Sequence, residues 1–163
     1  MTYIRTTIPN DAPGLVGMIR KLAAFQGLAD QCHVNEKELR RDLSSSGQRQ
    51  VRGLVAVDED KYAGFCLFYP SHYSSFSNTW GLEIHDLFVE EDFRGQHIGL
   101  KLIHTVAFWA NTEKENLPRI RLQVLEDNLQ AKAFYENLGG NISPSCDGEH
   151  TVRFETTALL ERT

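Results

Sequence analysis

The spacing of apolar positions changes several times along the chain, and each change marks a predicted element. A helical spacing predicts an amphipathic helix over residues 12–26, with Leu15, Met18, Ile19, Leu22 and Phe25 on its apolar face. A short strand over residues 3–5 precedes it. Asn35 is a candidate N-cap of a second helix, which we expect to end at residues 44–47.

Beyond residue 50 the apolar positions recur with a period of two, which predicts strands. Residues 51–57 and 63–69 form a hairpin signal around the turn at residues 58–61. Residues 70–78 are rich in Ser, His and Tyr and are interpreted as a loop. The elements that follow are a strand at 82–89, a helix from about Ile98 to 116–118, a strand at 119–124, a helix from residue 127 or 128 through Leu138, and one or two strands at 141–142 and 151–157.

The predicted order is β-α-α-β-β-β-α-β-α-β(-β), a mixed α/β arrangement without repeats or low-complexity segments. The 163 residues are enough for one domain with its own core, and no stretch resembles a linker. We therefore expect a single domain over residues 1–163.

Composition and charge exclude several classes of function. A net charge of −5 argues against a general nucleic-acid binder, which needs a basic surface. The sequence begins without the apolar stretch of a signal peptide and contains no segment long enough to span a membrane. Cys32, Cys66 and Cys146 are far apart and odd in number, which indicates reduced thiols in the cytoplasm rather than disulfides or a zinc site.

The strand at 82–89 leads into an acidic turn at residues 90–92, a loop containing Arg94 and Gly95, and the helix that begins near Ile98. A strand, a short glycine-bearing loop and a helix place free backbone N–H groups and the positive end of a helix dipole at the end of the strand. Such an arrangement binds anions, above all phosphates. The loop matches neither a dinucleotide fingerprint nor a Walker loop. An ordinary strand-to-helix turn remains the alternative.

This loop resembles the acyl-CoA pyrophosphate loop of the GNAT N-acetyltransferases, Arg/Gln-x-x-Gly-x-Gly/Ala. It matches that pattern at Arg94 and Gly99, and departs from it at His97, which replaces the first motif glycine.

A second segment resembles the family's N-x-x-A-x-x-F/L-Y-x-x-x-G-F helix, at Asn128, Ala131, Phe134, Tyr135 and Gly139, with Gly140 in place of the closing aromatic. The resemblance covers nearly the whole chain. It implies the GNAT fold, a mixed and mostly antiparallel central sheet with a splayed pair of parallel strands and flanking helices. An amphipathic helix with core aromatics is the alternative for this segment.

Within the family, the chain is most similar to the diamine (spermidine/spermine) acetyltransferases, on its Ile-Arg start, the strand at residues 64–69 and the Asp-Leu-Phe-Val run at residues 86–89. The resemblance implies acetyl transfer from acetyl-CoA to a primary amine, without a metal. It also implies a homodimer. The acceptor expected is a small molecule such as a diamine, a polyamine or an amino acid.

By the same resemblance, the backbone at the end of the strand pairs with the pantetheine arm of the cofactor, and the loop amides hold its pyrophosphate. The residues implied in cofactor binding are Leu87, Phe88, Val89, Arg94, Gly95, Gln96, His97, Ile98, Gly99, Leu100, Asn128, Ala131 and Phe134.

Two residues are implied in the chemistry. Tyr135 matches the tyrosine that protonates the leaving CoA thiolate in the relatives, and packing against the cofactor is the alternative. His85 stands where the diamine acetyltransferases have a glutamate that deprotonates the amine. A neutral imidazole is a competent base near neutral pH, and packing on the exposed sheet face is the alternative.

Three residues are implied in binding the acceptor: Gln26, Asp86 and Asp147. Because Gln26 and His85 replace acidic residues of the relatives, a highly cationic polyamine is in doubt. A smaller amine or an amino acid fits as well. Two other hypotheses remain open: a protein lysine or N-terminus as acceptor, with residues 70–78 as a peptide edge, and a non-catalytic sensor of acyl-CoA.

Overall fold

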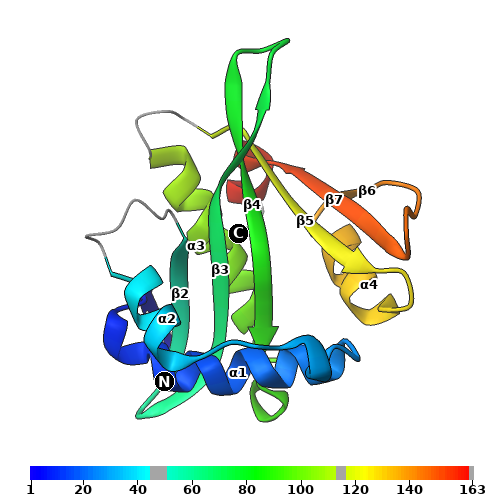
Figure 1. Ribbon diagram of the computed structural model, residues 1–163. Helices are drawn as coiled ribbons and strands as arrows, with labels where there is room; N and C mark the ends of the chain where they lie inside the picture. Colours follow the sequence, from blue (N-terminus) through cyan, green and yellow to red (C-terminus); the bar gives the residue numbers. More distant parts are fainter. Residues whose placement is uncertain (45–50, 113–116, 162–163) are drawn as a thin grey trace. The chain divides into compact units, whose positions relative to one another are not determined.

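The computed structural model describes residues 1–44, 51–112 and 117–161 (Figure 1). Its strands are β1 (Tyr3–Thr6), β2 (Arg52–Asp58), β3 (Lys61–Ser74), β4 (Thr79–Val89), β5 (Arg119–Leu125), β6 (Asn141–Ile142) and β7 (Glu149–Glu155). Its helices are α1 (Ala12–Phe25), α2 (Glu36–Asp42), α3 (Ile98–Thr112), α4 (Leu129–Asn137) and α5 (Thr156–Leu160), with short 3-10 turns at Pro9–Asp11, Ala29–Gln31 and Glu91–Phe93.

The strands form a seven-stranded sheet in the order β1-β2-β3-β4-β5-β7-β6. The β1–β2, β2–β3, β5–β7 and β6–β7 ladders are antiparallel, whereas β4 and β5 are parallel. The parallel ladder pairs Leu82 with Ile120 and ends where Ile84 pairs with Leu122, although β4 continues to Val89. The mixed, mostly antiparallel sheet with its flanking helices confirms the predicted fold class.

The chain divides into two compact units, which are described separately. The first unit comprises Met1–Phe68 and Asp86–Ile103, and the second comprises Tyr69–His85 and His104–Thr163. The expectation of a single domain stays a prediction.

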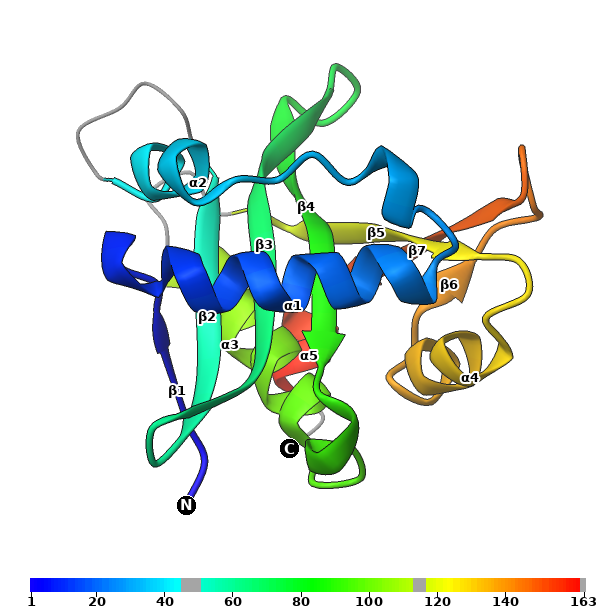
Figure 2. The ribbon, with the colours of Figure 1, turned by 60° about the horizontal axis from the view of Figure 1, so that its bottom comes forward.

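In the first unit, α1 and α2 pack against the strands through an apolar core. Leu15 of α1 and Leu39 of α2 are buried with Val55 of β2, Phe65 of β3 and Phe88 of β4. Figure 2 shows α1 crossing β2 and β3, with the helix axis lying across the strands. The α1 helix was predicted from the spacing of its apolar residues, and most of these residues form its buried face.

In the second unit, β5 and β7 form a long ladder, from Arg119 opposite Glu155 to Leu125 opposite Glu149. The buried side chains of this unit include Ile120 on β5 and Phe154 on β7. The aromatic ring of Tyr135 on α4 lies edge-on to that of Phe154, with ring centres 6.4 Å apart. The helix predicted from Asn128 therefore packs against the last long strand.

The prediction of a loop over residues 70–78 is wrong. β3 continues through Ser74, and β4 begins at Thr79, so only residues 75–78 form a turn. Tyr73 favours a strand, and the hairpin supplies backbone partners that the local sequence does not show. The strands expected at 63–69 and 82–89 are correspondingly too short.

Other boundaries differ by a few residues. The last strand begins at Glu149 rather than 151 and ends at Glu155, where the unpredicted α5 begins. Thr156 at this junction is buried, and its hydroxyl donates to the Leu117 carbonyl oxygen at 2.6 Å, which fixes the change from strand to helix. The predicted helix ends at residues 45–47 and near residue 116, and the onset of the period of two at residue 50, lie outside the described residues.

Candidate functional site

The predicted phosphate loop leads into α3 with free backbone donors. The first helical hydrogen bond of α3 runs from the Lys101 N–H to the His97 carbonyl oxygen, at 3.0 Å. Within the described part of the chain, the N–H groups of residues 95–100 donate to no acceptor. Unpaired N–H groups at the start of a helix of this length form an anion site, because they add to the positive end of the helix dipole.

His97 adopts a backbone conformation that favours glycine. Its φ angle is +59°, and that of Gly95 is +76°, so both residues lie in the left-handed region. This region costs an ordinary side chain about 1 kcal/mol, and histidine occupies it more readily than most residues do. The exposed His97 side chain therefore adds an imidazole to the surface of the loop, while its backbone keeps a conformation that glycine adopts readily.

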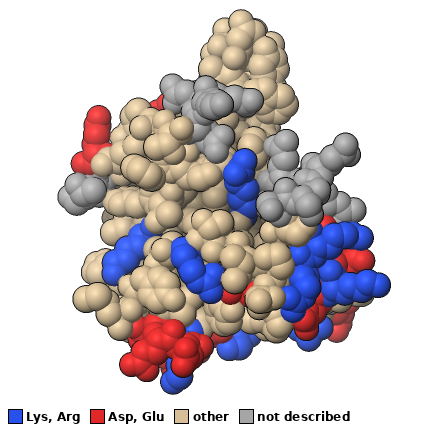
Figure 3. Space-filling model, turned by 90° about the vertical axis from the view of Figure 1, so that its left-hand side faces the viewer, with Lys and Arg blue, Asp and Glu red and all other residues tan. Residues whose placement is uncertain are grey.

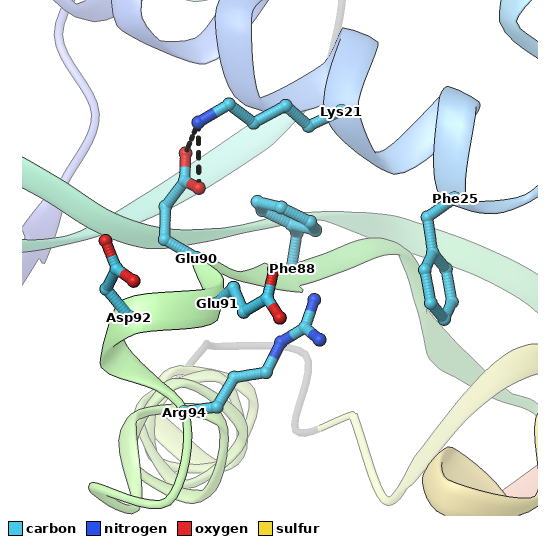
Figure 4. Close-up of a pocket in the computed structure, with 7 residues that line it drawn as sticks. All are labelled: Lys21, Phe25, Phe88, Glu90, Glu91, Asp92 and Arg94. Atoms are coloured by element: carbon cyan, nitrogen blue, oxygen red, sulfur yellow. Dashed lines mark hydrogen bonds and ion pairs between the residues drawn. The ribbon is translucent and has the colours of Figure 1, made fainter.

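Arg94 is held in place at the start of this loop. Its Nε donates to the Val89 carbonyl oxygen at 3.2 Å, and its guanidinium carbon lies 5.9 Å from the ring centre of Phe25 at the end of α1. Figure 4 shows the side chains of Arg94 and Phe25. The helical spacing places Phe25 on the apolar face of the predicted helix, but its side chain is 59% exposed. An aromatic residue at a helix end can serve a cation instead of the core.

A cavity of about 400 Å³ lies beside Arg94 in the first unit, and its lining is Lys21, Phe25, Phe88, Glu90, Glu91, Asp92 and Arg94. The Lys21 ammonium contacts both carboxylate oxygens of Glu90, at 2.8 and 2.9 Å (Figure 4). This pair neutralises one cation, which leaves two carboxylates and one guanidinium in the lining. The cavity is therefore not an anion site by itself, and the free amides of residues 95–100 are the better candidate for phosphate. Neither Lys21 nor Glu90 was singled out from the sequence.

The end of β4 lies close against β3. The Glu90 N–H donates to the Ala63 carbonyl oxygen at 2.9 Å, and a Cβ on Gly64 would lie 2.6 Å from the Phe88 carbonyl oxygen. Phe88 is buried, whereas Leu87 and Val89 are half-buried. The three residues predicted to pair with the pantetheine arm thus lie on one strand end, and Gly64 is required by the close approach of its backbone.

In the second unit, the predicted motif helix has the expected cap. The Asn128 side-chain oxygen accepts from the Ala131 N–H at 3.1 Å, so Asn128 is the N-cap of α4. Its side-chain NH2 group donates to no residue of the described chain. Tyr135 is 7% exposed and packs between Phe134 and Phe154, with ring centres 5.3 and 6.4 Å away. The helix therefore holds the Tyr135 ring in one place.

His85 is exposed on β4, and its ring centre lies 6.2 Å from that of Tyr69 on β3. Glu83, two residues earlier on the same face of the strand, is buried and ion-paired with Arg121 of β5. Asp86, which follows His85, is half-buried. Burial and the Asp86 carboxylate raise the pKa of the buried Cys66 thiol, which keeps that thiol protonated and unreactive.

The remaining acceptor residues lie in different places. Gln26 is exposed at the C-terminal end of α1, where its N–H donates to the Leu22 carbonyl oxygen at 3.0 Å. Asp147 is exposed in a turn before β7, with φ of +52°, and is followed by Gly148 with φ of +83°. The first unit thus holds Gln26 with Asp86, and the second holds Asp147.

Two broader features concern metals and membranes. In residues 1–44, 51–112 and 117–161, no three His, Cys, Asp or Glu side chains gather as metal ligands would. None of the described helices combines the length and the hydropathy of a membrane span. Figure 3 shows one face of the described residues, where Lys and Arg side chains lie among Asp and Glu side chains.

Comparison with known proteins gives matches over most of the chain. The sequence matches the acetyltransferase (GNAT) family over residues 21–139. It is 30% identical to the thialysine N-epsilon-acetyltransferase of Bos taurus, a match that covers 97% of this chain and 95% of that protein. It is 36% identical to the L-ornithine N5-acetyltransferase NATA1 of Arabidopsis thaliana, over 49% of this chain and 34% of that protein.

Solved structures share the fold at lower identity. The crystal structure of Arabidopsis thaliana NAA60 in complex with acetyl-CoA superposes with a TM-score of 0.73 and 16% identity, covering 95% of this chain and 98% of that one. Together with the family match over residues 21–139, which is more than half of the sequence, these similarities lead to one conclusion. The chain belongs to the acetyltransferase (GNAT) family and is an N-acetyltransferase.

Proposed function

We propose that the protein transfers the acetyl group of acetyl-CoA to a primary amine of a small molecule, a diamine, polyamine or amino-acid-like compound. The observation that carries this proposal is the similarity to thialysine N-epsilon-acetyltransferase, which extends over 97% of the chain. The free amides at the start of α3 support it, because acetyl-CoA carries a pyrophosphate that such donors bind.

The transfer is direct, within a complex of enzyme, acetyl-CoA and amine. The neutral amine attacks the thioester carbonyl carbon, the C–N bond forms, and the C–S bond breaks as the CoA thiolate leaves. Tyr135 gives its phenolic proton to that thiolate, and His85 accepts the proton that the amine must lose. Cys66 has a raised pKa and is fully buried, which argues against it as a nucleophile for an acyl-enzyme.

The cofactor would lie along the strand end and the loop. The backbone of Leu87, Phe88 and Val89 would pair with the pantetheine arm, and the residue 95–100 amides would hold the pyrophosphate with Arg94 beside them. In the second unit, the Asn128 amide group, Ala131 and Phe134 would contact the arm.

The experiment that tests this function measures CoA-thiol release from acetyl-CoA with spermidine, short diamines, ornithine, lysine and thialysine. We expect turnover of at least one of them, and we expect Tyr135→Phe to lower kcat by at least tenfold while acetyl-CoA still binds. Tyr73→Phe, at an exposed tyrosine of the β3–β4 hairpin, is the matched control and should leave kcat unchanged. If none of these amines is turned over, the same assay is run with lysine-containing peptides. Turnover of peptides alone would indicate a protein acceptor, and binding of acetyl-CoA without any turnover would indicate a sensor.

We further propose that the protein acts in the cytoplasm, as a homodimer and without nucleic acid or membrane partners. Size-exclusion chromatography with light scattering tests the dimer, since a monomeric mass at micromolar concentration would contradict it.

A further inference from the structure

Three strands of the second unit place charged side chains on the face that carries His85. In register, Glu83 of β4 lies opposite Arg121 of β5, which lies opposite Arg153 of β7. Residues in register on neighbouring strands project to the same face. His85 lies two residues beyond Glu83 on that face, which is about 7 Å along the strand.

The charges of this row do not cancel. The Glu83 carboxylate, 8% exposed, is ion-paired with Arg121 and so balances one guanidinium. The Arg153 side chain is exposed, and makes no hydrogen bond or ion pair with any other residue of the described chain. Along the same face, Arg119 donates to the Ser77 hydroxyl at 2.8 Å and lies in register with Glu155 at the far end of β7. The centre of the row therefore keeps one uncompensated cation.

His72 of β3 lies where the electrostatic potential of this row is positive. Its imidazole packs over Gly81 of β4, where a Cβ would lie 2.0 Å from the Nε2 atom. Burial lowers the pKa of His72, and so do the cations of Arg121, Arg119 and Arg153, against the opposing effect of Glu83. The cations thus outweigh the buried carboxylate at this position. The His72 Nδ1 atom is buried and has no partner among the described residues.

We propose that Arg153, supported by Arg121, binds the carboxylate of an amino-acid acceptor whose side-chain amine reaches His85. The inference rests on the proposed function and narrows its acceptor class to basic amino acids such as lysine, thialysine and ornithine. A guanidinium is the side chain best suited to a carboxylate, because its planar N–H groups can bind both oxygens.

The separation of His85 and Arg153 suits an acceptor that carries a carboxylate at one end and an amine at the other. From His85, the Arg153 position is about 7 Å along the strands and about 10 Å across two strand spacings. Because the arginine side chain covers part of that span, an extended amino acid with an amine on its side chain can bridge the rest. Arg121 remains paired with Glu83 and keeps that carboxylate from attracting the acceptor's ammonium groups.

The same face discriminates against polyamines. A second or third ammonium group in place of the carboxylate would lie beside Arg153 and be repelled. His85 and Gln26, which stand where the relatives have acidic residues, also disfavour polyamines. Both side chains attract ammonium groups less than a carboxylate would.

The test compares lysine with lysinamide, which has the same side-chain amine but no carboxylate. For the wild-type protein we expect a kcat/KM at least tenfold higher for lysine than for lysinamide. Arg153→Gln should lower kcat/KM for lysine at least tenfold and leave that for lysinamide unchanged, whereas Arg153→Lys should retain part of the preference. Arg41→Gln removes an exposed arginine of α2 in the first unit and should change neither value.

The carboxylate site and the acetyltransferase activity can be contradicted separately. Equal kcat/KM for lysine and lysinamide, or a loss in Arg153→Gln that affects both equally, would overturn the carboxylate site while leaving an amine acetyltransferase. If no amine is turned over, the proposed function fails. In that case the affinities of lysine and lysinamide for the protein saturated with CoA are compared by calorimetry. Equal affinities would contradict the carboxylate site.

Discussion

The guanidinium of Arg94 lies over the ring of Phe25, 5.9 Å from its centre, and so joins the start of the phosphate loop to the end of α1. A cation over an exposed aromatic ring contributes about 0.5–1 kcal/mol. The Val89 carbonyl oxygen fixes the same side chain from the other side. The positive charge is thus positioned before any ligand arrives, which reduces the ordering cost of binding a phosphate.

Replacement of Arg94 should weaken cofactor binding. We expect Arg94→Gln to lower acetyl-CoA affinity about tenfold, because a charge-assisted hydrogen bond contributes roughly 1.5–3 kcal/mol. Phe25→Leu should lower it only about twofold, since the charge remains but is less well held. Calorimetry at low and high salt measures both, and the salt dependence should be weaker in Arg94→Gln. Arg20→Gln, on the exposed side of α1, is the control. Unchanged affinity in Arg94→Gln would place the pyrophosphate elsewhere.

His97→Gly should stabilise the protein without loss of cofactor binding. The φ angle of +59° strains a histidine but not a glycine, so the free energy of unfolding should rise by up to about 1 kcal/mol, offset in part by the entropy that glycine adds to the unfolded chain. Urea denaturation measures the change, and calorimetry with acetyl-CoA measures affinity. Gly95→Ala, at φ of +76°, should have the opposite effect on stability. Weaker binding in His97→Gly would show that the imidazole itself contacts the phosphate.

The fold could be predicted from the sequence because most elements carry a local signal. The helical spacing of α1, the Asn35 and Asn128 caps, and the alternation in β5 each act over a few residues, and each was confirmed. The extension of β3 through Ser74 could not be predicted, because it depends on pairing with a partner strand rather than on its own composition. The same holds for α5, whose start depends on the Thr156 contact with Leu117.

The two motifs could be located in the sequence, whereas the ion pairs around them could not. The replacement of a motif glycine by His97 is visible in the sequence, whereas its left-handed backbone is seen only in the structure. The Lys21–Glu90 pair joins residues far apart in the sequence, and no spacing rule connects them. Arg121 and Arg153 alternate with apolar residues in their strands, which indicates a polar face, but only the register brings them side by side.

Gly81 should tolerate no side chain while His72 is present. In Gly81→Ala the new Cβ would lie 2.0 Å from the His72 ring, so the ring or the hairpin must shift, and we expect a loss of about 2 kcal/mol in the free energy of unfolding. His72→Ala in the same chain should restore part of this stability, because it removes the ring. A double-mutant cycle by urea denaturation measures the coupling. Gly17→Ala is the control, because nothing lies within 4 Å of a Cβ there. Additive effects of the two changes would contradict the contact.

Acid should destabilise the first unit through Asp11. This carboxylate is 2% exposed, and burial alone would raise its pKa. The two hydrogen bonds from Arg5, at 2.7 and 2.8 Å, and those from the Ile8 N–H and the Tyr62 hydroxyl outweigh burial and lower the pKa to about 2.

Because the pKa is depressed in the folded state, the stabilisation is fully present above the ordinary value of 3.8 and is lost as the pH falls from about 4 to about 2. The difference between these two pKa values corresponds to about 2 kcal/mol. We expect Asp11→Asn to lower the free energy of unfolding by at least this amount at pH 7, and by less at pH 3, where the wild-type protein has begun to lose the same contribution. Urea denaturation at both pH values measures the difference, with Asp30→Asn at an exposed position as the control. An equal loss at pH 7 and pH 3 would mean that the carboxylate acts through its shape and not through its charge.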